Sequence, residues 1–216
     1  MNDKVEKLQY QHFNFGPFVF YIRLPDRIKE RMLADAQDIY DLPSHEYQLA
    51  GEIEKQRRYK QETVEWFYQE TSRIFQIYRA EHCKYHEIPD YPVQYEGKEI
   101  WVNFMEAGEV NPTHIHGGDL SYVYFLKVPW QIKDEGILHE GNNTAPGRLT
   151  FDYTHDSHTP WGTCTKSVEP KEGHMIIFPS MLRHYVSPFK SKVQRISISG
   201  NLTVQNRDEF PYKHYF

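Results

Sequence analysis

Two histidines one residue apart stand in front of an apolar run, in the segment HIHGGDLSYVYFL at residues 114–126. Alternate residues of an extended strand project from the same face, so His114 and His116 would point one way while Ile115 packs on the other. Two imidazoles on one face can hold a transition-metal ion. His184 begins another predicted strand after the apolar run MIIFP. One distant histidine at that position could complete the site.

The segment QRISISGN adds a polar face, because its alternation separates Arg195, Ser197 and Ser199 from two isoleucines. A hairpin turn over residues 187–192 would pair residue 184 with residue 195. Directly opposed residues of an antiparallel pair face the same side, so His184 and Arg195 are expected to enter one cavity. A buried guanidinium without a counter-charge is costly. We therefore expect Arg195 to hold an anion, and a carboxylate fits its planar fork best.

The second part of the chain, from about residue 99, must position these residues. It contains short β-type runs separated by Gly, Pro, Asn and Asp, which predict an antiparallel barrel or sandwich. The runs are EIWVNFM, LSYVYFLKV, RLTFDY, GHMIIFP, HYVSPF and VQRISISGNLTV. The polar, glycine-rich stretch 133–147 is predicted to be an exposed loop near an opening.

The first part of the chain reads as one strand followed by helices. FVFYIRLP at 18–25 predicts a strand, and a helix should follow with Asp26 as its N-cap. A longer helix is predicted over about 55–82, with the charged cluster KQRRYK at 55–60 on its solvated face. We therefore expect an N-terminal part, 1–95, that supports a β-core, 96–216, within one compact domain.

Composition limits the class of protein. The chain has 216 residues with 39% hydrophobic and 15% aromatic content, enough for a packed core. A net charge of −5 with dispersed carboxylates provides no basic face, so no nucleic-acid partner is expected. The longest apolar run, FVFYI, is far shorter than the roughly 20 residues of a membrane span. Two distant cysteines and a polar N-terminus favour the cytoplasm.

Three segments together carry a family resemblance: 101–126, 172–189 and 195–201, with LAGEI at 49–53 upstream. The most specific part is a histidine followed eleven residues later by Arg-x-Ser. The sequence resembles the iron(II)- and 2-oxoglutarate-dependent oxygenases, in particular a branch of bacteria and tailed phages with an N-terminal LAG element. The resemblance implies a mainly β fold with N-terminal helices, whose core is a double-stranded β-helix (a cupin-like jelly roll) with one iron in its open mouth.

In that family two histidines and one carboxylate bind the metal. The resemblance implies that His114 and His184 are the two histidine ligands and take part in catalysis. His116 stands where the family more usually has Asp, which leaves three alternatives. His116 is a third, neutral ligand, or Asp119 reaches the metal through a bend at Gly117–Gly118, or water takes the carboxylate position.

The resemblance also implies a cosubstrate, 2-oxoglutarate. It would chelate Fe(II) and place its far carboxylate against Arg195 and Ser197, while Tyr124 and Asn103 match family positions that commonly contact it. With O2 the enzyme would hydroxylate a protein side chain or a small molecule and release succinate and CO2. A phage-encoded enzyme of this kind would act in the host cytoplasm.

Two other functions remain open. A cupin-like metalloenzyme would use three histidines without 2-oxoglutarate, and a non-catalytic barrel would act as an interaction module. Arg195 discriminates between the two enzymes, because only the oxygenase requires a buried cation near the metal. A competing metal signal is HDSH at 155–158, where His155 and His158 could bind an ion if that loop were helical.

Overall fold

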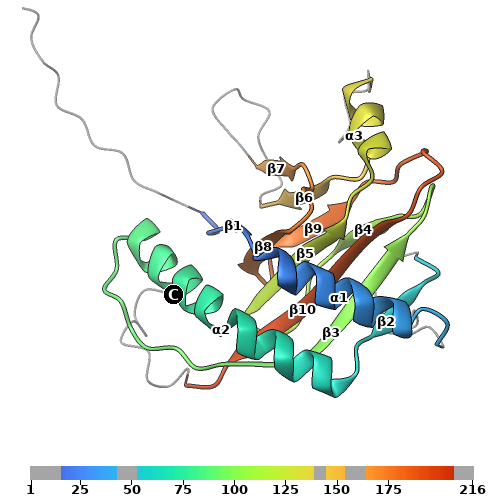
Figure 1. Cartoon of the computed structure of the whole chain (residues 1–216). Helices are drawn as coiled ribbons and strands as arrows, with labels where there is room; N and C mark the ends of the chain where they lie inside the picture. Colours follow the sequence, from blue (N-terminus) through green and yellow to red (C-terminus); the bar gives the residue numbers. More distant parts are fainter. Residues whose placement is uncertain (1–15, 43–52, 139–144, 154–163, 207–216) are drawn as a thin grey trace, which may run out of the picture.

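The computed structural model describes residues 16–42, 53–138, 145–153 and 164–206, and its strands form two antiparallel sheets (Figure 1). The larger sheet has the order β1-β8-β5-β10-β3-β2, with the bounds Phe20–Arg23, His174–Pro179, Leu120–Lys127, Arg195–Val204, Tyr95–Met105 and Gln56–Arg58. The smaller sheet has the order β4-β9-β6-β7, with the bounds Asn111–His114, Arg183–Val186, Leu149–Asp152 and Thr165–Val168. All six predicted β-type runs of the second part therefore contain strands.

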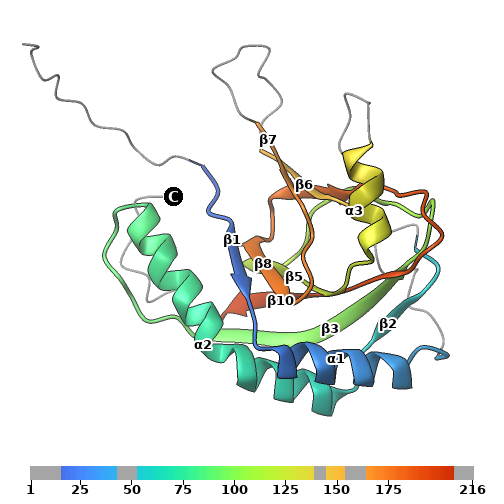
Figure 2. The same ribbon diagram turned by 45° about the horizontal axis from the view of Figure 1, so that its top comes forward.

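Three helices accompany the sheets: α1 (Asp26–Asp38), α2 (Gln61–Tyr85) and α3 (Trp130–Ile137). Figure 2 shows α1 and α2 side by side along the larger sheet, on the face turned away from the smaller sheet. In the part of the chain that the structure describes, no helix is long and apolar enough to cross a bilayer.

Two hydrophobic clusters follow from the alternation of the strands. Along β5, Tyr122 and Tyr124 belong to the cluster between the larger sheet and the helices. Val123 and Phe125 belong to the cluster between the two sheets, together with Leu149, Phe151 and Val186 of the smaller sheet. Successive residues of a strand thus serve opposite faces, and the parity of a residue decides whether it can reach the barrel interior.

The predicted hairpin between residues 184 and 195 is wrong. Strand β9 pairs with β4 and β6 in the smaller sheet, whereas β10 pairs with β3 and β5 in the larger one. The connection between them therefore crosses from one sheet to the other, and Phe189 within it is buried in the cluster between the sheets. The Glu135 carboxylate of α3 accepts hydrogen bonds from the backbone N–H groups of Lys190 and Ser191, which fixes this crossing.

The secondary structure of the charged cluster KQRRYK also differs from the predicted helix. Residues 56–58 form β2, an edge strand paired with β3, and Gln56 and Arg57 are only 2% and 8% exposed. The helix α2 begins after this strand, at Gln61. Pairing with β3 determines the structure here, and it overrides the weak local preference of a run of charged residues.

Two smaller expectations in the helices need correction. Pro25 occupies the N-cap position of α1, and Asp26 is its first helical residue, with a carboxylate that accepts a hydrogen bond from Arg23 Nη2. The predicted loop 133–147 begins within α3, which ends at Ile137. Residues 139–144 of that loop, residues 49–52 of LAGEI, and His155 and His158 of the HDSH segment lie outside the described residues.

Candidate metal centre

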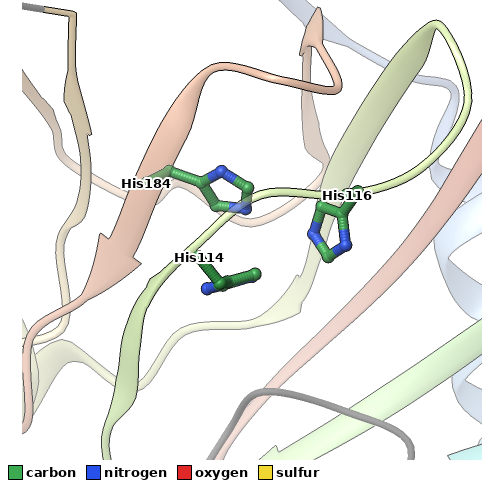
Figure 3. A group of neighbouring side chains, drawn as sticks. All are labelled: His114, His116 and His184. Atoms are coloured by element: carbon green, nitrogen blue, oxygen red, sulfur yellow. The ribbon is translucent and has the colours of Figure 1, made fainter.

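Three histidines from two segments of the chain meet in the barrel interior. His114 is the last residue of β4 and lies opposite His184 of β9. His116 follows β4 in a bend, where its backbone N–H donates to the Ser180 carbonyl at 2.9 Å. The potential ligand atoms of all three side chains lie within 4.8 Å of one another, and Figure 3 shows the rings around a common space. Such a group could hold one metal ion.

Backbone carbonyls fix the orientation of two of these rings. His114 Nδ1 lies 2.6 Å from the Pro112 carbonyl oxygen, and His184 Nδ1 lies 2.8 Å from that of Leu182. A neutral imidazole that donates its Nδ1–H to a carbonyl leaves Nε2 as the unprotonated nitrogen, which is the form that binds metals. Both rings therefore present Nε2 as the candidate ligand atom.

The surroundings keep the three imidazoles neutral. Burial, and to a smaller extent the neighbouring histidines, lowers the pKa of His116 to about 3 and that of His184 to about 4. Burial also lowers the pKa of His114 below its ordinary value, against a smaller opposing effect of the Pro112 carbonyl. Metal ions bind deprotonated imidazole, so the cluster is ready for a metal near pH 7.

Acidification should therefore destabilise the metal-free protein. Between the folded-state pKa of about 3 and the ordinary value of 6.5, His116 binds fewer protons in the folded chain than in the unfolded chain. Its contribution to stability is complete above pH 6.5 and is lost as the pH falls, with a slope of up to about 1.4 kcal/mol per pH unit. Urea unfolding at pH 5 and pH 7 measures this loss. H116N should show a smaller difference between the two pH values, and an equal difference would contradict the prediction.

Arg195 enters the same pocket from the opposite sheet. The side chain is 2% exposed, and its Nε and Nη2 atoms have no hydrogen-bond partner. Nη1 lies 3.4 Å from Ser197 Oγ and 3.8 Å from Met105 Sδ, and the guanidinium carbon lies 5.2 Å from the centroid of the Phe125 ring. Burial lowers the pKa of Arg195 to about 10, so the guanidinium remains charged at neutral pH. Among the described residues, no carboxylate forms an ion pair with it.

The pocket contains a cavity of about 30 Å³ and is partly open to solvent. Its apolar wall consists of Ile53, Trp101, Met105, Val123, Leu149 and Val186, and its polar lining consists of Gln56, Asn103, Asn111, His114, His116, His184, Arg195, Ser197 and Ser199. The structure therefore brings together the three histidines, Arg195, Ser197 and Asn103 that the sequence singled out.

Two residues named in the sequence analysis lie elsewhere. Tyr124 projects from the other face of β5 into the core beneath the helices, where its ring lies 6.4 Å from that of Phe67. The bend at Gly117–Gly118 directs Asp119 to the end of β10, and its Oδ2 accepts a hydrogen bond from the Val204 N–H at 2.7 Å. The geometry thus favours His116 over Asp119 as the third ligand.

Other residues of the pocket were missed. Gln56 Nε2 donates to Asn103 Oδ1 at 2.7 Å, and both side chains are buried. Trp101 also lines the pocket, and its ring lies 5.8 Å from the His116 ring. The position of Trp101 in the pocket could have been predicted from the sequence. Trp101, Asn103 and Met105 are alternate residues of β3 and therefore project from the same face. Gln56 gave no such signal, because β2 has no apolar alternation.

The residues fit the metal and cosubstrate that the sequence resemblance implies. Imidazole nitrogen is a suitable donor for iron(II) as well as for zinc, copper and nickel. A fully buried guanidinium with two unpartnered nitrogens fits an anion that enters from the pocket. Asn103, Ser197 and Ser199 add polar groups around the same space.

A jelly roll that gathers three imidazoles and a buried arginine in its interior defines a class, the double-stranded β-helix proteins with a metal-type centre. Residues 99–201 match the family described as "Putative 2OG-Fe(II) oxygenase". This part of the chain is therefore similar to the iron(II)- and 2-oxoglutarate-dependent oxygenases, in agreement with the resemblance carried by its sequence motifs. A comparison with curated proteins finds no match.

Solved structures support the fold. A prolyl-4-hydroxylase from Pseudomonas putida is 16% identical with a TM-score of 0.55, and the match covers 86% of this chain and 91% of that one. A prolyl hydroxylase from Trichoplax adhaerens, in complex with a hypoxia inducible factor peptide, is 13% identical with a TM-score of 0.53, covering 86% and 82%. The carbocyclase SnoK from nogalamycin biosynthesis is 10% identical with a TM-score of 0.54, covering 86% and 79%. The predicted jelly-roll fold is confirmed.

Proposed function

We propose that this chain is a hydroxylase that depends on iron(II) and 2-oxoglutarate. His114, His116 and His184 would hold the metal, and Arg195 with Ser197 would bind the far carboxylate of the cosubstrate. The observation that carries the proposal is the buried guanidinium of Arg195, which shares a pocket with the three imidazoles and has two nitrogens without partners. A cupin-like enzyme without a dianionic cosubstrate would have no use for this cation.

The chain's own residues would bind, orient and exclude water. The Asn103 carbonyl accepts from Gln56, so its amide nitrogen remains to donate to a ligand oxygen in the pocket. The Pro112 and Leu182 carbonyls hold the rings of His114 and His184 in place. Apolar side chains such as Val123, Leu149 and Val186 line the pocket and would exclude water from it. Electrostatic contacts between the pocket and a bound ligand are stronger where water is excluded.

The bound iron would supply the activation of O2, by which one oxygen atom enters a C–H bond of the substrate and the other enters succinate, with release of CO2 from 2-oxoglutarate. We propose a protein side chain or a small molecule as the substrate, in the cytoplasm. Selection between these classes would depend on the chain around the mouth of the pocket, since loops on a rigid scaffold commonly carry specificity.

The proposal predicts slow turnover without any substrate. Purified protein with iron(II), ascorbate and 2-oxoglutarate should form succinate, measured by chromatography, at a rate that increases with protein concentration. Calorimetry under nitrogen should show that 2-oxoglutarate binds the iron-loaded protein and that S197A weakens this binding by several-fold, about 1 kcal/mol for one hydrogen bond. Folded, iron-loaded protein that shows neither turnover nor binding would reject the proposal.

A further inference from the structure

A second pair of neighbouring histidines lies outside the barrel, at the C-terminal end of α2. His82 belongs to the last turn of this helix, and His86 is its C-cap residue. Residues four apart lie on the same face of a helix, one turn above the other, and the centroids of the two rings are 4.5 Å apart. The helix covers the face of the larger sheet that is turned away from the smaller sheet (Figure 2). The proposed function does not use this pair.

The two rings are arranged like those of the candidate metal centre. There the centroid distances are 4.3 Å between His114 and His184, 4.8 Å between His114 and His116, and 5.0 Å between His116 and His184. The distance of 4.5 Å between His82 and His86 falls within this range. The planes of these two rings are inclined at 56°, the same angle as between His114 and His184. The helix thus holds two imidazoles at a spacing that suits a shared metal ion.

The ring nitrogens of this pair are not engaged by the protein. Among the residues that the structure describes, His82 and His86 have ring contacts but no side-chain hydrogen bond or ion pair. The His82 ring lies 6.0 Å from that of Phe18 and 6.2 Å from that of Tyr78, and the His86 ring lies 4.8 Å from that of Tyr85. Both histidines are partly exposed, so an ion from solvent can reach them.

The electrostatic surroundings favour a cation at this position. Burial, and to a smaller extent the charge of His86, lowers the pKa of His82 to about 4, and burial also lowers the pKa of His86. Both imidazoles are therefore deprotonated near pH 7, as metal binding requires. The C-terminal end of a helix carries the negative end of its macrodipole. The Lys84 ammonium in the same turn pairs with Glu81 at 3.7 Å.

We infer that His82 and His86 form a second metal site, a two-histidine clamp on α2 for divalent copper, nickel or zinc. No third histidine, cysteine or carboxylate among the described residues joins the pair, so water would complete the coordination. Imidazole suits these ions, and affinity for nitrogen ligands is higher for copper and nickel than for iron(II). A site with only two protein ligands should therefore bind nickel and leave iron(II) to the barrel.

The test compares matched variants of the full, metal-free chain. After dialysis against nickel(II), H82N and H86N should each contain one equivalent of nickel less than the unmodified protein, because a single imidazole cannot chelate. H174N is the control. The His174 ring stacks on Tyr21 at 5.0 Å, and its Nδ1 lies 3.0 Å from the Glu172 carbonyl oxygen. H174N should retain the full nickel content, and anaerobic iron(II) content should be the same in all four proteins.

A second measurement requires no substitution. Copper(II) is paramagnetic and broadens the NMR signals of nuclei close to it. At substoichiometric copper, the assigned imidazole signals of His82 and His86 should broaden together, while those of His174 should stay sharp.

The outcomes separate this inference from the proposed function. Loss of one nickel equivalent in both H82N and H86N supports the clamp, and succinate formation by iron-loaded H86N should equal that of the unmodified protein. If nickel is lost in this way but no protein forms succinate, the clamp stands and the oxygenase proposal fails. Equal nickel content in H86N and the unmodified protein, an equal loss in H174N, or sharp signals of His82 and His86 would show that the pair only packs against its aromatic neighbours, and would overturn the inference.

Discussion

Replacing Arg195 with methionine is expected to weaken 2-oxoglutarate binding strongly and, at the same time, to stabilise the metal-free protein. The guanidinium is buried without an ion-pair partner among the described residues, and two of its nitrogens have no hydrogen bond. Replacement of even a buried ion pair by apolar side chains of similar volume is often neutral or stabilising, by up to about 4 kcal/mol, and Arg195 has no partner to offset the cost of its burial. Loss of the cation should weaken cosubstrate binding at least about 100-fold, since truncating a buried charge pair costs about 2–5 kcal/mol.

Arg57 provides the matched control. It is a second buried arginine, but its Nε and Nη1 donate to the carbonyls of Tyr40 and Gln56, and it does not line the pocket. R57M should therefore destabilise the protein and leave 2-oxoglutarate affinity unchanged. Urea unfolding and anaerobic calorimetry measure both quantities for both variants. A destabilised R195M that still binds 2-oxoglutarate would mean that the arginine has a structural role.

Replacing His116 with alanine is expected to remove the metal, whereas D119N should retain it. In the structure the His116 ring lies 4.8 Å from that of His114 and 5.0 Å from that of His184, measured between centroids. Loss of a direct ligand should reduce metal affinity by more than the roughly 10–100-fold that is typical when an outer hydrogen-bond partner is lost. Metal content after dialysis and a chelator competition measure the affinity.

The D119N variant separates two alternatives that the sequence left open. Its amide oxygen can still accept from the Val204 N–H, so the fold should be retained with a loss of about 1 kcal/mol from the weaker, uncharged acceptor. If D119N loses the metal while H116A keeps it, Asp119 is the ligand and the observed path of the bend does not represent the metal-bound chain.

Much of the candidate site followed from strand alternation. The polar face of β10 was predicted from the RISIS pattern, and Arg195 and Ser197 do project into the interior while Ile196 and Ile198 face the helices. The same rule would have excluded Tyr124, because it alternates with Val123 and Phe125, which face the interior. Tyr124 was named from a family position, and its parity on β5 places it on the other side.

What the sequence could not provide is the pairing of distant segments. A turn-rich connection such as 187–194 is compatible with a hairpin or with a crossing between sheets, and only the pairing of β9 and β10 with strands of different sheets distinguishes the two. The strand β2 has no hydrophobic pattern of its own and exists because β3 offers it an edge. The position of His116 likewise depends on a contact with Ser180 beyond the end of β4.

The placement of His184 and Arg195 on different sheets has a consequence for ligand selection. A molecule gripped at one end by the metal and at the other by the guanidinium must span the interior, and the packed core between the sheets, including Phe125 and Phe178, fixes that span. On the proposed function, the barrel would thereby select dicarboxylates by the length of their carbon chain. A dicarboxylate one methylene shorter would reach only one end, and one methylene longer would have to force two rigid walls apart.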